Sequence, residues 1–361
     1  MTSNLLLYFF PPPTYLSQPA YGIDLSDRSL KYVVLTEHRT SISLDDYGEQ
    51  IIPEGVIQGG VVKDEIALQE VLDQLHREVG IKRAVISLPE EKAFIVPLKT
   101  PPVPMRQLRD TLELQLEDQI PLPVGEVEFD YVHQDERVDD YLSLSAIHKG
   151  IAASYLKAFQ KSEIMPLVFE IEAHALARAL IKNGDPGTFM IVDFGRTRTS
   201  FVIVSDGIVW FSSTVAIGGD AIAEAIEKKS GLSREAAVHL KETRGLSRSA
   251  DNKELFSNLT PVVSVLKDEV NKHYLYWNSH SEDHSMPRPK IERILMCGGD
   301  ANIPGLLEYL SSGLDTPIAF ANPWINILPS FDKEIPPMTF NNSLRYATAL
   351  GLALRKILPQ Q

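Results

Sequence analysis

The chain has 361 residues, and its 35 Lys and Arg against 48 Asp and Glu give a formal net charge of −13. At roughly 100–200 residues per domain, this length predicts two or three domains. A hydrophobic fraction of 44% with 23% charged residues is typical of globular proteins, and it excludes a mostly disordered chain and a coiled coil. The acidic balance argues against a nucleic-acid-binding protein, because phosphate binding needs clustered positive charge.

Cysteine usage and apolar runs favour a cytoplasmic protein. Cys297 is the single cysteine, so an intrachain disulfide or a Cys-rich zinc site cannot form. No apolar run approaches the roughly 20 residues of a transmembrane helix. Residues 1–20 are predicted to be an extended arm, because the apolar run 5–10 is followed by prolines at 11–13, which favour a polyproline conformation. The sequence leaves open whether this arm contacts its own domain, a partner or a membrane.

Alternating strands and helices predict an α/β protein. The prolines at 101–104 and 121–123 enclose an amphipathic helix, so residues 85–148 are interpreted as a small α+β insert. In chain order we expect strands at 23–35 and 51–57, a helix at 64–79, a strand at 84–88 and a helix at 105–119. Strands at 127–132 and 141–147, helices at 151–161 and 172–182, and a strand at 189–192 follow. The last expected elements are helices at 220–229, 234–242 and 260–278 and a strand at 294–297.

The most informative feature of the sequence is an internal repeat. Residues 23–35 and 192–204 each contain a strand ending in Asp, a small residue two positions later, a polar turn and a second apolar strand. The two aspartates, Asp24 and Asp193, are 193 − 24 = 169 residues apart. An accidental match is not expected to recur in the same strand context. Each copy therefore predicts a β-hairpin with a carboxylate at its mouth.

Two such hairpins are suited to a polyphosphate and its metal ion. Backbone N–H groups in a tight polar turn form an anion-binding nest, and a carboxylate can hold a metal-bound water. One hairpin from each half could clamp the phosphates with Mg²⁺ between them. Gly-Gly turns at 218–219 and 298–299 precede predicted helices and allow a ligand to approach the backbone. The alternative is a pair of ordinary hairpins with solvated turns.

Together these features resemble the actin-like ATPase superfamily, which includes FtsA and has a two-lobed, ribonuclease H-like α/β fold. The closest likeness is to the PilM family of type IV pilus assembly proteins, through residues 87–90, 120–123 and 217–220. The likeness covers about residues 20–358. It implies an N-terminal arm at 1–20, a first lobe at 21–84 and 149–184, an inserted subdomain at 85–148, a second lobe at 185–342, and a C-terminal helix at 343–361 that returns to the first lobe.

The resemblance also implies a site for ATP and Mg²⁺. Asp24 and Asp193 would face the metal ion from opposite lobes, and Glu172 stands where chaperone-like relatives have an acidic residue near the attacking water. Glu172 and Asp193 are therefore the candidate catalytic residues. The candidate nucleotide-binding residues are Asp24, Ser26, Asp27, Arg28, Ser29, Lys31, Gly195, Thr197, Thr199, Gly218, Gly219, Lys241, Gly298, Gly299 and Ala301.

Two departures from the superfamily pattern bear on activity. The first turn has Ser26 where relatives commonly have Gly, so its backbone is expected to fit phosphate less closely. Val238 stands where division-type relatives tend to have Glu, which removes a hydrogen bond to the ribose. We therefore expect ATP binding with at most slow hydrolysis. This expectation suits PilM-like proteins, which act as nucleotide-dependent platforms.

Three functions are compatible with the resemblance. The first is a cytoplasmic ATP-binding adaptor of the type IV pilus platform, at the inner face of the cytoplasmic membrane. Its partner would be the cytoplasmic N-terminal tail of a PilN-type membrane protein, received by an apolar groove beside residues 85–148. Other pilus assembly components and a second copy of the chain are further expected partners. The alternatives are an FtsA-like membrane tether and an actin-fold small-molecule kinase.

Overall fold

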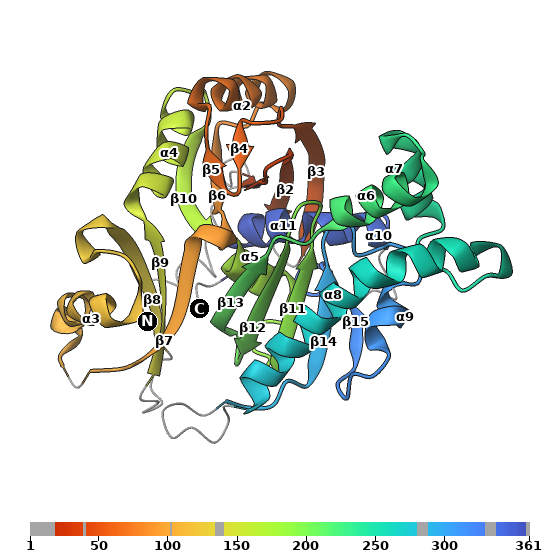
Figure 1. Ribbon diagram of the computed structural model, residues 1–361. Coiled ribbons are helices and arrows are strands. Elements are labelled where there is room, and N and C mark those ends of the chain that lie inside the picture. The colour runs from red at the N-terminus through yellow and green to blue at the C-terminus, as the bar shows by residue number, and fades with distance from the viewer. Residues whose placement is uncertain are drawn as a thin grey trace.

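The computed structural model of the chain describes residues 19–38, 41–101, 103–133, 141–279, 288–328 and 337–358. Most of the predicted N-terminal arm, residues 1–18, lies outside these residues. Figure 1 shows two large sheets, each with helices packed against it, and a smaller sheet to one side of them, next to β13 (Ile208–Val215) of the second. The two large sheets together form the body of the molecule.

The first large sheet has the strand order β10-β6-β1-β2-β3. Strand β2 pairs antiparallel with β1 and β3, whereas β6 pairs in parallel with β1 and β10. Helices α2 and α4 share one hydrophobic core with this sheet. The bounds are β1 (Ala20–Leu25), β2 (Ser29–Glu37), β3 (Ile42–Ile51), α2 (Glu65–Val79), β6 (Arg83–Leu88), α4 (Lys149–Gln160) and β10 (Met165–Ile171).

The second large sheet repeats this topology, with the order β13-β12-β11-β14-β15. Strand β12 pairs antiparallel with β11 and β13, and β14 pairs in parallel with β11 and β15. The sequence repeat is therefore part of a structural duplication, in which β1 corresponds to β11 and β2 to β12. The bounds are β11 (Thr188–Phe194), β12 (Thr199–Ser205), β13 (Ile208–Val215), β14 (Arg293–Cys297) and β15 (Ile318–Phe320).

Two helices connect the large sheets where they approach each other. Helix α11 (Ala347–Leu354) packs so closely on β1 that a Cβ atom at Gly22 would lie 2.2 Å from the carbonyl oxygen of Ala349. It also packs on α5 (Glu172–Leu180), because a Cβ atom at Gly351 would lie 1.8 Å from the carbonyl oxygen of Ala175. Any larger side chain at Gly22 or Gly351 would force these elements apart.

The other helices lie mainly around the second large sheet and the inserted subdomain (Figure 1). Their bounds are α3 (Met105–Gln119), α6 (Gly219–Ser230), α7 (Arg234–Thr243), α8 (Lys253–Ser279), α9 (Leu306–Ser311) and α10 (Phe340–Ser343). A two-stranded ribbon, β4 (Ile57–Gln58) and β5 (Val61–Val62), follows β3.

The smaller sheet has the antiparallel order β7-β9-β8 and shares a hydrophobic core with α3. Its strands are β7 (Ala93–Lys99), β8 (Val127–His133) and β9 (Tyr141–His148). The predicted start of the insert at residue 85 is wrong, because β6 lies inside the first large sheet between β1 and β10. The insert begins after β6, at the 3-10 turn η2 (Glu90–Lys92). The other domain boundaries stay a prediction.

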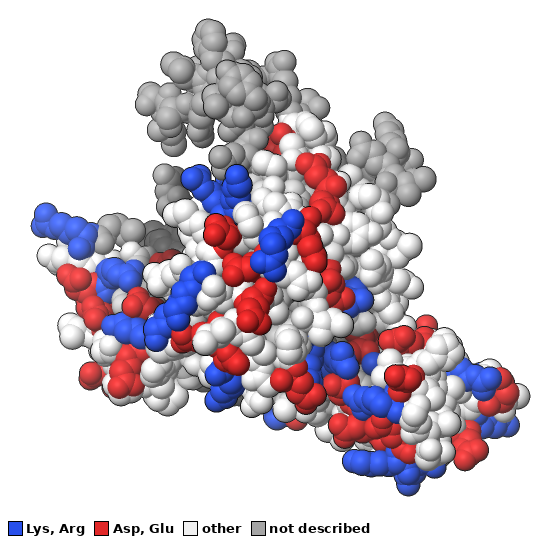
Figure 2. Space-filling view, turned by 90° about the horizontal axis from the view of Figure 1, so that it is seen from above, with Lys and Arg blue, Asp and Glu red and all other residues white. Residues whose placement is uncertain are grey.

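Charged side chains are mixed over the surface seen from above. Figure 2 shows Lys and Arg interspersed with Asp and Glu on this face. The view shows no broad positive field of the kind that nucleic-acid binding requires. Among the described residues, no helix has the length and apolar character needed to cross a bilayer.

Candidate functional site

The two Asp hairpins face one polar cavity of about 420 Å³ between the large sheets. Asp24 reaches it from β1 and Asp193 from β11, each one residue before the end of its strand. The structure thus brings together side chains that are far apart in the chain. The predicted site residues that line the cavity are Asp24, Ser26, Asp27, Arg28, Ser29, Lys31, Glu172, Asp193, Gly195, Thr197, Lys241, Gly298 and Gly299.

Four predicted residues lie outside the described lining of this cavity: Thr199, Gly218, Gly219 and Ala301. The Thr199 hydroxyl donates a hydrogen bond to the carbonyl oxygen of Ile217 at 2.6 Å. The Gly219 N–H donates to the carbonyl oxygen of Gly195 at 3.0 Å. The side chain of Ala301 is fully buried. Thr199 and Gly219 therefore attach the second hairpin to the segment at 217–219 through hydrogen bonds.

The two aspartates share one electrostatic environment. Burial, followed by the charge of Asp24, raises the pKa of Asp193 to about 6. Burial also raises the pKa of Asp24, against the opposing charges of Lys31 and Arg198. A raised pKa means that the positive charge around these carboxylates does not compensate for their burial. Two under-compensated carboxylates facing one cavity fit a hard cation such as Mg²⁺.

The described residues contain no group of three or more His, Cys, Asp or Glu that could hold a metal ion. A magnesium ion at Asp24 and Asp193 would therefore need oxygen ligands from phosphate groups and water. This arrangement is common, because Mg²⁺ usually keeps several waters and is bound by one or two carboxylates together with substrate phosphates. The residues present fit a metal ion that arrives with a nucleotide.

Backbone geometry around Asp193 requires a glycine in the neighbouring loop. Gly298 has φ = +102°, and a Cβ atom there would lie 2.5 Å from Oδ1 of Asp193. The thiol of Cys297 is hydrogen-bonded to Asp193, and burial, together with that carboxylate, raises the pKa of the thiol well above its usual range. A side chain at position 298 would thus collide with both the Phe194 carbonyl group and the Asp193 carboxylate.

The first hairpin turn uses its side chains to hold its own shape. The hydroxyl of Ser26 donates to the carbonyl oxygen of Ser29 at 3.0 Å and accepts from the Ser29 N–H at 3.2 Å. Asp27 accepts hydrogen bonds from the N–H groups of Gly59 and Gly60, at 2.9 and 3.1 Å. The Asp27 carboxylate therefore joins this turn to the turn between β4 and β5. The serine at position 26 is part of the turn's closure.

Arg198 also lines the cavity, and the sequence analysis did not select it. Its guanidinium lies 2.6 Å from Glu91, 3.0 Å from Glu172 and 3.8 Å from Asp27. Burial alone would lower the pKa of Arg198, but these carboxylates hold it above its usual range. The repeat does not mark this position, because 198 − 169 = 29 and the first copy has Ser29 there.

Helix α7 contributes a second ion pair and an acidic residue that the sequence analysis did not select. Lys241 is buried and pairs with Asp300, which directly follows Gly299. Val238 and Glu242 also line the cavity, one helical turn apart on the same face. Val238 stands where division-type relatives tend to have Glu, but the same wall of the cavity also carries the carboxylate of Glu242, four residues later.

A second cavity, of about 460 Å³, lies beside the smaller sheet and is called the groove below. It runs between β8 and β10, and each of these is an edge strand of its sheet. Helix α5 and the turn between β12 and β13 complete its walls. Apolar lining residues include Phe129, Ala146, Ile147, Phe169, Ile171 and Val209.

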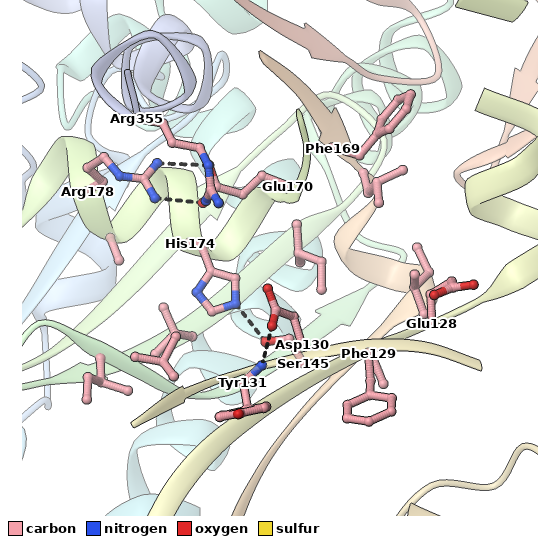
Figure 3. A pocket seen from close by; sticks show the side chains of 18 of the residues that line it. Glu128, Phe129, Asp130, Tyr131, Ser145, Phe169, Glu170, His174, Arg178 and Arg355 are labelled. Carbon is pink, nitrogen blue, oxygen red and sulfur yellow. Dashed lines mark hydrogen bonds and ion pairs between the residues drawn. The ribbon is translucent and has the colours of Figure 1, made fainter. Parts of the chain in front are cut away.

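One end of the groove carries a buried charge cluster. Figure 3 shows Arg178 and Arg355 around Glu170, and His174 pointing towards Ser145. Arg178 makes two hydrogen bonds to Glu170, at 2.6 and 2.8 Å, and Arg355 makes a further one. Burial would raise the pKa of Glu170, but the two arginines hold it below its usual value. Burial lowers the pKa of His174, so its ring is neutral near pH 7.

Comparison with known families identifies the chain. A family model described as type IV pilus assembly protein PilM matches residues 22–357, which is nearly the whole sequence. The chain belongs to the PilM family. The resemblance inferred from the Asp hairpins and the Gly-Gly turns is thereby confirmed.

Solved structures confirm the actin-like ATPase fold for this PilM-family chain. A PilM–PilN type IV pilus biogenesis complex matches with a TM-score of 0.77 at 21% identity, covering 94% of this chain and 99% of that chain. EutJ, an ethanolamine utilization protein from Carboxydothermus hydrogenoformans, matches with a TM-score of 0.53 at 16% identity, covering 95% and 90%. MreB5 of Spiroplasma citri bound to AMPPNP matches with a TM-score of 0.53 at 14% identity, covering 94% and 95%.

Proposed function

We propose that this PilM-family protein is an ATP-binding adaptor of the type IV pilus assembly platform, at the cytoplasmic face of the inner membrane. In this role it binds Mg²⁺-ATP in the polar cavity and the N-terminal tail of a PilN-type membrane protein in the groove. The observation that carries the proposal is the placement of Asp24 and Asp193, from duplicated hairpins, on one cavity. The separate groove beside the insert supplies the second binding site.

The chemistry of the polar cavity supports a nucleotide. Mg²⁺ bound with ATP would supply the positive charge that the two buried aspartates lack. Arg28, Lys31, Arg196 and Arg345 line the same cavity and would face the phosphate groups. The MreB5 structure of the same fold is a complex with AMPPNP, a nucleotide. The glycines at 298 and 299 allow the nucleoside part to approach the backbone of the loop that follows β14.

The contacts of Glu172 support slow turnover. Its carboxylate accepts hydrogen bonds from one guanidinium nitrogen of Arg198, at 3.0 and 3.3 Å. A carboxylate held in this way is poorly placed to accept a proton from an attacking water. The protein would therefore bind ATP in a platform role and hydrolyse it at a low rate.

The architecture of the groove supports an extended peptide. Strands β8 and β10 are edge strands, and an extended segment can add its backbone to such an edge. Apolar side chains of the peptide would be buried against Phe129, Phe169 and Val209. The solved complex with a TM-score of 0.77 contains a PilM protein with PilN. Binding through a tail would hold the adaptor at the membrane.

The experiment that tests the proposal measures the two ligands separately on the full chain. Calorimetry with Mg²⁺-ATP tests the cavity. Fluorescence anisotropy with a labelled peptide, the N-terminal tail of the PilN-type protein from the same genome, tests the groove. We expect saturable 1:1 binding in both titrations. Absence of binding in either titration would overturn the corresponding half of the proposal.

A further inference from the structure

One edge of the first large sheet leaves apolar side chains exposed. Met165 and Leu167 lie on the edge strand β10, and their exposed fractions are 59% and 40%. Two residues after Leu167, Phe169 lines the groove. The edge therefore presents an apolar path that leads along β10 into the groove. An edge strand also offers its outer backbone N–H and C=O groups to another extended segment.

The start of β1 lies at the same end of the sheet as the start of this path. Strands β1, β6 and β10 are parallel neighbours, and Gly22 is level with Val85 in β6 and Val168 in β10. Ala20, the first residue of β1, is therefore at the end of the sheet where Met165 begins β10. Two strand spacings, or about 10 Å, separate β1 from β10.

The segment that precedes β1 suits this path by its composition. Residues 1–18, which lie outside the described residues, include no Asp, Glu, Lys, Arg or His. The run 5–10 consists of leucine, tyrosine and phenylalanine, and prolines follow at 11–13. Burying such a run removes apolar surface from water without burying a charge. Its N–H groups can pair with a strand edge, whereas the prolines, which lack an N–H group, would end the pairing.

The connecting segment is long enough for the run to reach the groove. Residues 11–19 connect the run to β1, and a fully extended chain of this length covers about 30 Å, at about 3.3 Å per residue. The path needs about 10 Å to cross from β1 to β10 and about 13 Å to follow β10 from Met165 to Phe169. The run 5–10 can therefore enter the groove of its own chain.

The electrostatics of the groove suit an uncharged segment. Glu170 is buried at one end, where Arg178 and Arg355 pair with it (Figure 3). Glu128 and Asp130, on β8, are exposed to water. A segment without charges leaves the pairing of Glu170 intact and covers the apolar wall, so its binding costs no unpaired charge.

We propose, on the basis of the function proposed above, that residues 5–10 occupy the groove of the same chain and compete there with the tail of the PilN-type membrane protein. The run buries its leucine and aromatic side chains against Phe129, Phe169 and Val209. A tethered segment needs only weak intrinsic affinity, because a short linker gives it an effective concentration on the order of 1 mM. With a dissociation constant of about 0.2 mM for the untethered run, the tail would bind about sixfold more weakly.

The first experiment compares the wild type with the full-length double variant Leu6→Asp/Phe9→Asp. The two changes put a carboxylate on each face of an extended run, so neither face can be buried without cost. Fluorescence anisotropy measures the dissociation constant of the labelled tail peptide of the PilN-type protein. The variant is expected to bind the tail about sixfold more tightly than the wild type, because its groove is free.

The matched control is Tyr15→Asp/Leu16→Asp, which adds the same charge to the same arm beyond the prolines. It should bind the tail as the wild type does. Equal tail affinities of the wild type and Leu6→Asp/Phe9→Asp would overturn the competition and leave the proposed function intact. An equal gain of affinity in the control would also overturn it, because the gain would then follow from charge alone.

A second experiment locates the run without the PilN-type tail. A labelled peptide with residues 1–14 of this chain is titrated into Leu6→Asp/Phe9→Asp, whose own arm no longer competes. We expect a dissociation constant of about 0.2 mM, and loss of binding when Ala152→Trp in α4 is added to narrow the groove. Undiminished binding with Ala152→Trp present would place the run elsewhere and overturn the proposal. If the tail peptide binds neither protein, the proposed function fails, whereas arm-peptide binding that Ala152→Trp abolishes would still support docking of the run in the groove.

Two further measurements on the wild type and Leu6→Asp/Phe9→Asp separate the other possible occupants. Both proteins are expected to sediment as the same species, and neither should co-sediment with phosphatidylglycerol vesicles. A dimer that the double variant loses would assign the run to a second copy of the chain. Vesicle binding that the double variant loses would assign the run to the lipid surface. Either result would overturn docking within the same chain.

Discussion

Asp24 and Asp193 occupy equivalent positions in two duplicated sheets, and burial, followed by the charge of Asp24, raises the pKa of Asp193 in a cavity that both residues line. In the ladders, Asp24 is paired with Lys31 and Asp193 with Ser200. The duplication therefore places two carboxylates together but gives only the first one a cationic partner directly opposite it in the ladder. The charge of Arg198, in the turn of the second hairpin, opposes the raised pKa of Asp193 without cancelling the effect of burial. This asymmetry leaves a deficit of positive charge at Asp193, where a cation would be bound.

The first prediction concerns these aspartates. Asp24→Asn and Asp193→Asn are each expected to weaken Mg²⁺-ATP binding by roughly 10–100-fold, because a contact to a charged group is worth about 1.5–3 kcal/mol. The ligand-free melting temperature at pH 8 should not fall, since each change removes a buried, under-compensated charge. Calorimetry and thermal denaturation measure the two effects. Chelation of Mg²⁺ in the wild type should reproduce the binding loss, and unchanged affinity in both variants would contradict the assignment.

The second prediction concerns the groove. Ala152 in α4 lines the groove, whereas its neighbour Ala153 is exposed and does not line it. Ala152→Trp is expected to block the tail peptide, because the indole would occupy part of a cavity of about 460 Å³. Ala153→Trp on the same helix is the control and should bind the peptide as wild type does. Anisotropy titrations of both variants decide the matter, and equal peptide binding by the two would place the peptide elsewhere.

The third prediction concerns Glu90. Burial raises the pKa of its carboxyl group to about 7. The charge of Arg198 opposes this shift, and the charge of Glu91 adds a smaller contribution to it. A folded-state pKa above the usual 4.5 means that the folded protein binds the proton more tightly. The protein should therefore lose stability as the pH rises from 4.5 through 7, by an amount on the order of 3 kcal/mol. Glu90→Gln should remove this loss and keep the hydrogen bond from the N–H of Ala173. Chemical denaturation at pH 5 and pH 8 checks it, and an equal pH dependence in both proteins would argue against it.

The fourth prediction has the opposite sign. The pKa of Glu170 lies below its usual value because of Arg178 and Arg355, so its stabilising contribution is present above the unfolded-state pKa. It is lost as the pH falls through the lower folded-state pKa. Glu170→Gln should cost about 3 kcal/mol at pH 7, since it leaves two partly buried arginines without their counter-charge. The difference from wild type should shrink below about pH 4. A constant difference between pH 3 and pH 7 would refute this account.

Part of the site could be predicted because it depends on local sequence. The Asp hairpins are short-range patterns, in which strand, polar turn and strand follow one another within 13 residues, and their repetition marks both halves of the cavity. Other predicted residues lie outside the lining of the cavity, because a glycine or hydroxyl in a turn does not reveal which side of the turn faces a cavity. Gly219 and Thr199 instead make hydrogen bonds that hold the second hairpin in place. The boundary at 85 failed because an apolar strand does not reveal which sheet it joins.

By itself, the sequence determined the family, the duplicated hairpins and the residues at their mouths, because these features are written in contiguous residues with fixed spacing. Only the tertiary structure decided that Arg198 meets Glu91 and Glu172, and that α5 borders both cavities. Such contacts join residues 107 and 26 positions apart, from different sheets and turns. Their energies depend on burial and distance in the folded molecule, and neither quantity is carried by the order of residues along the chain.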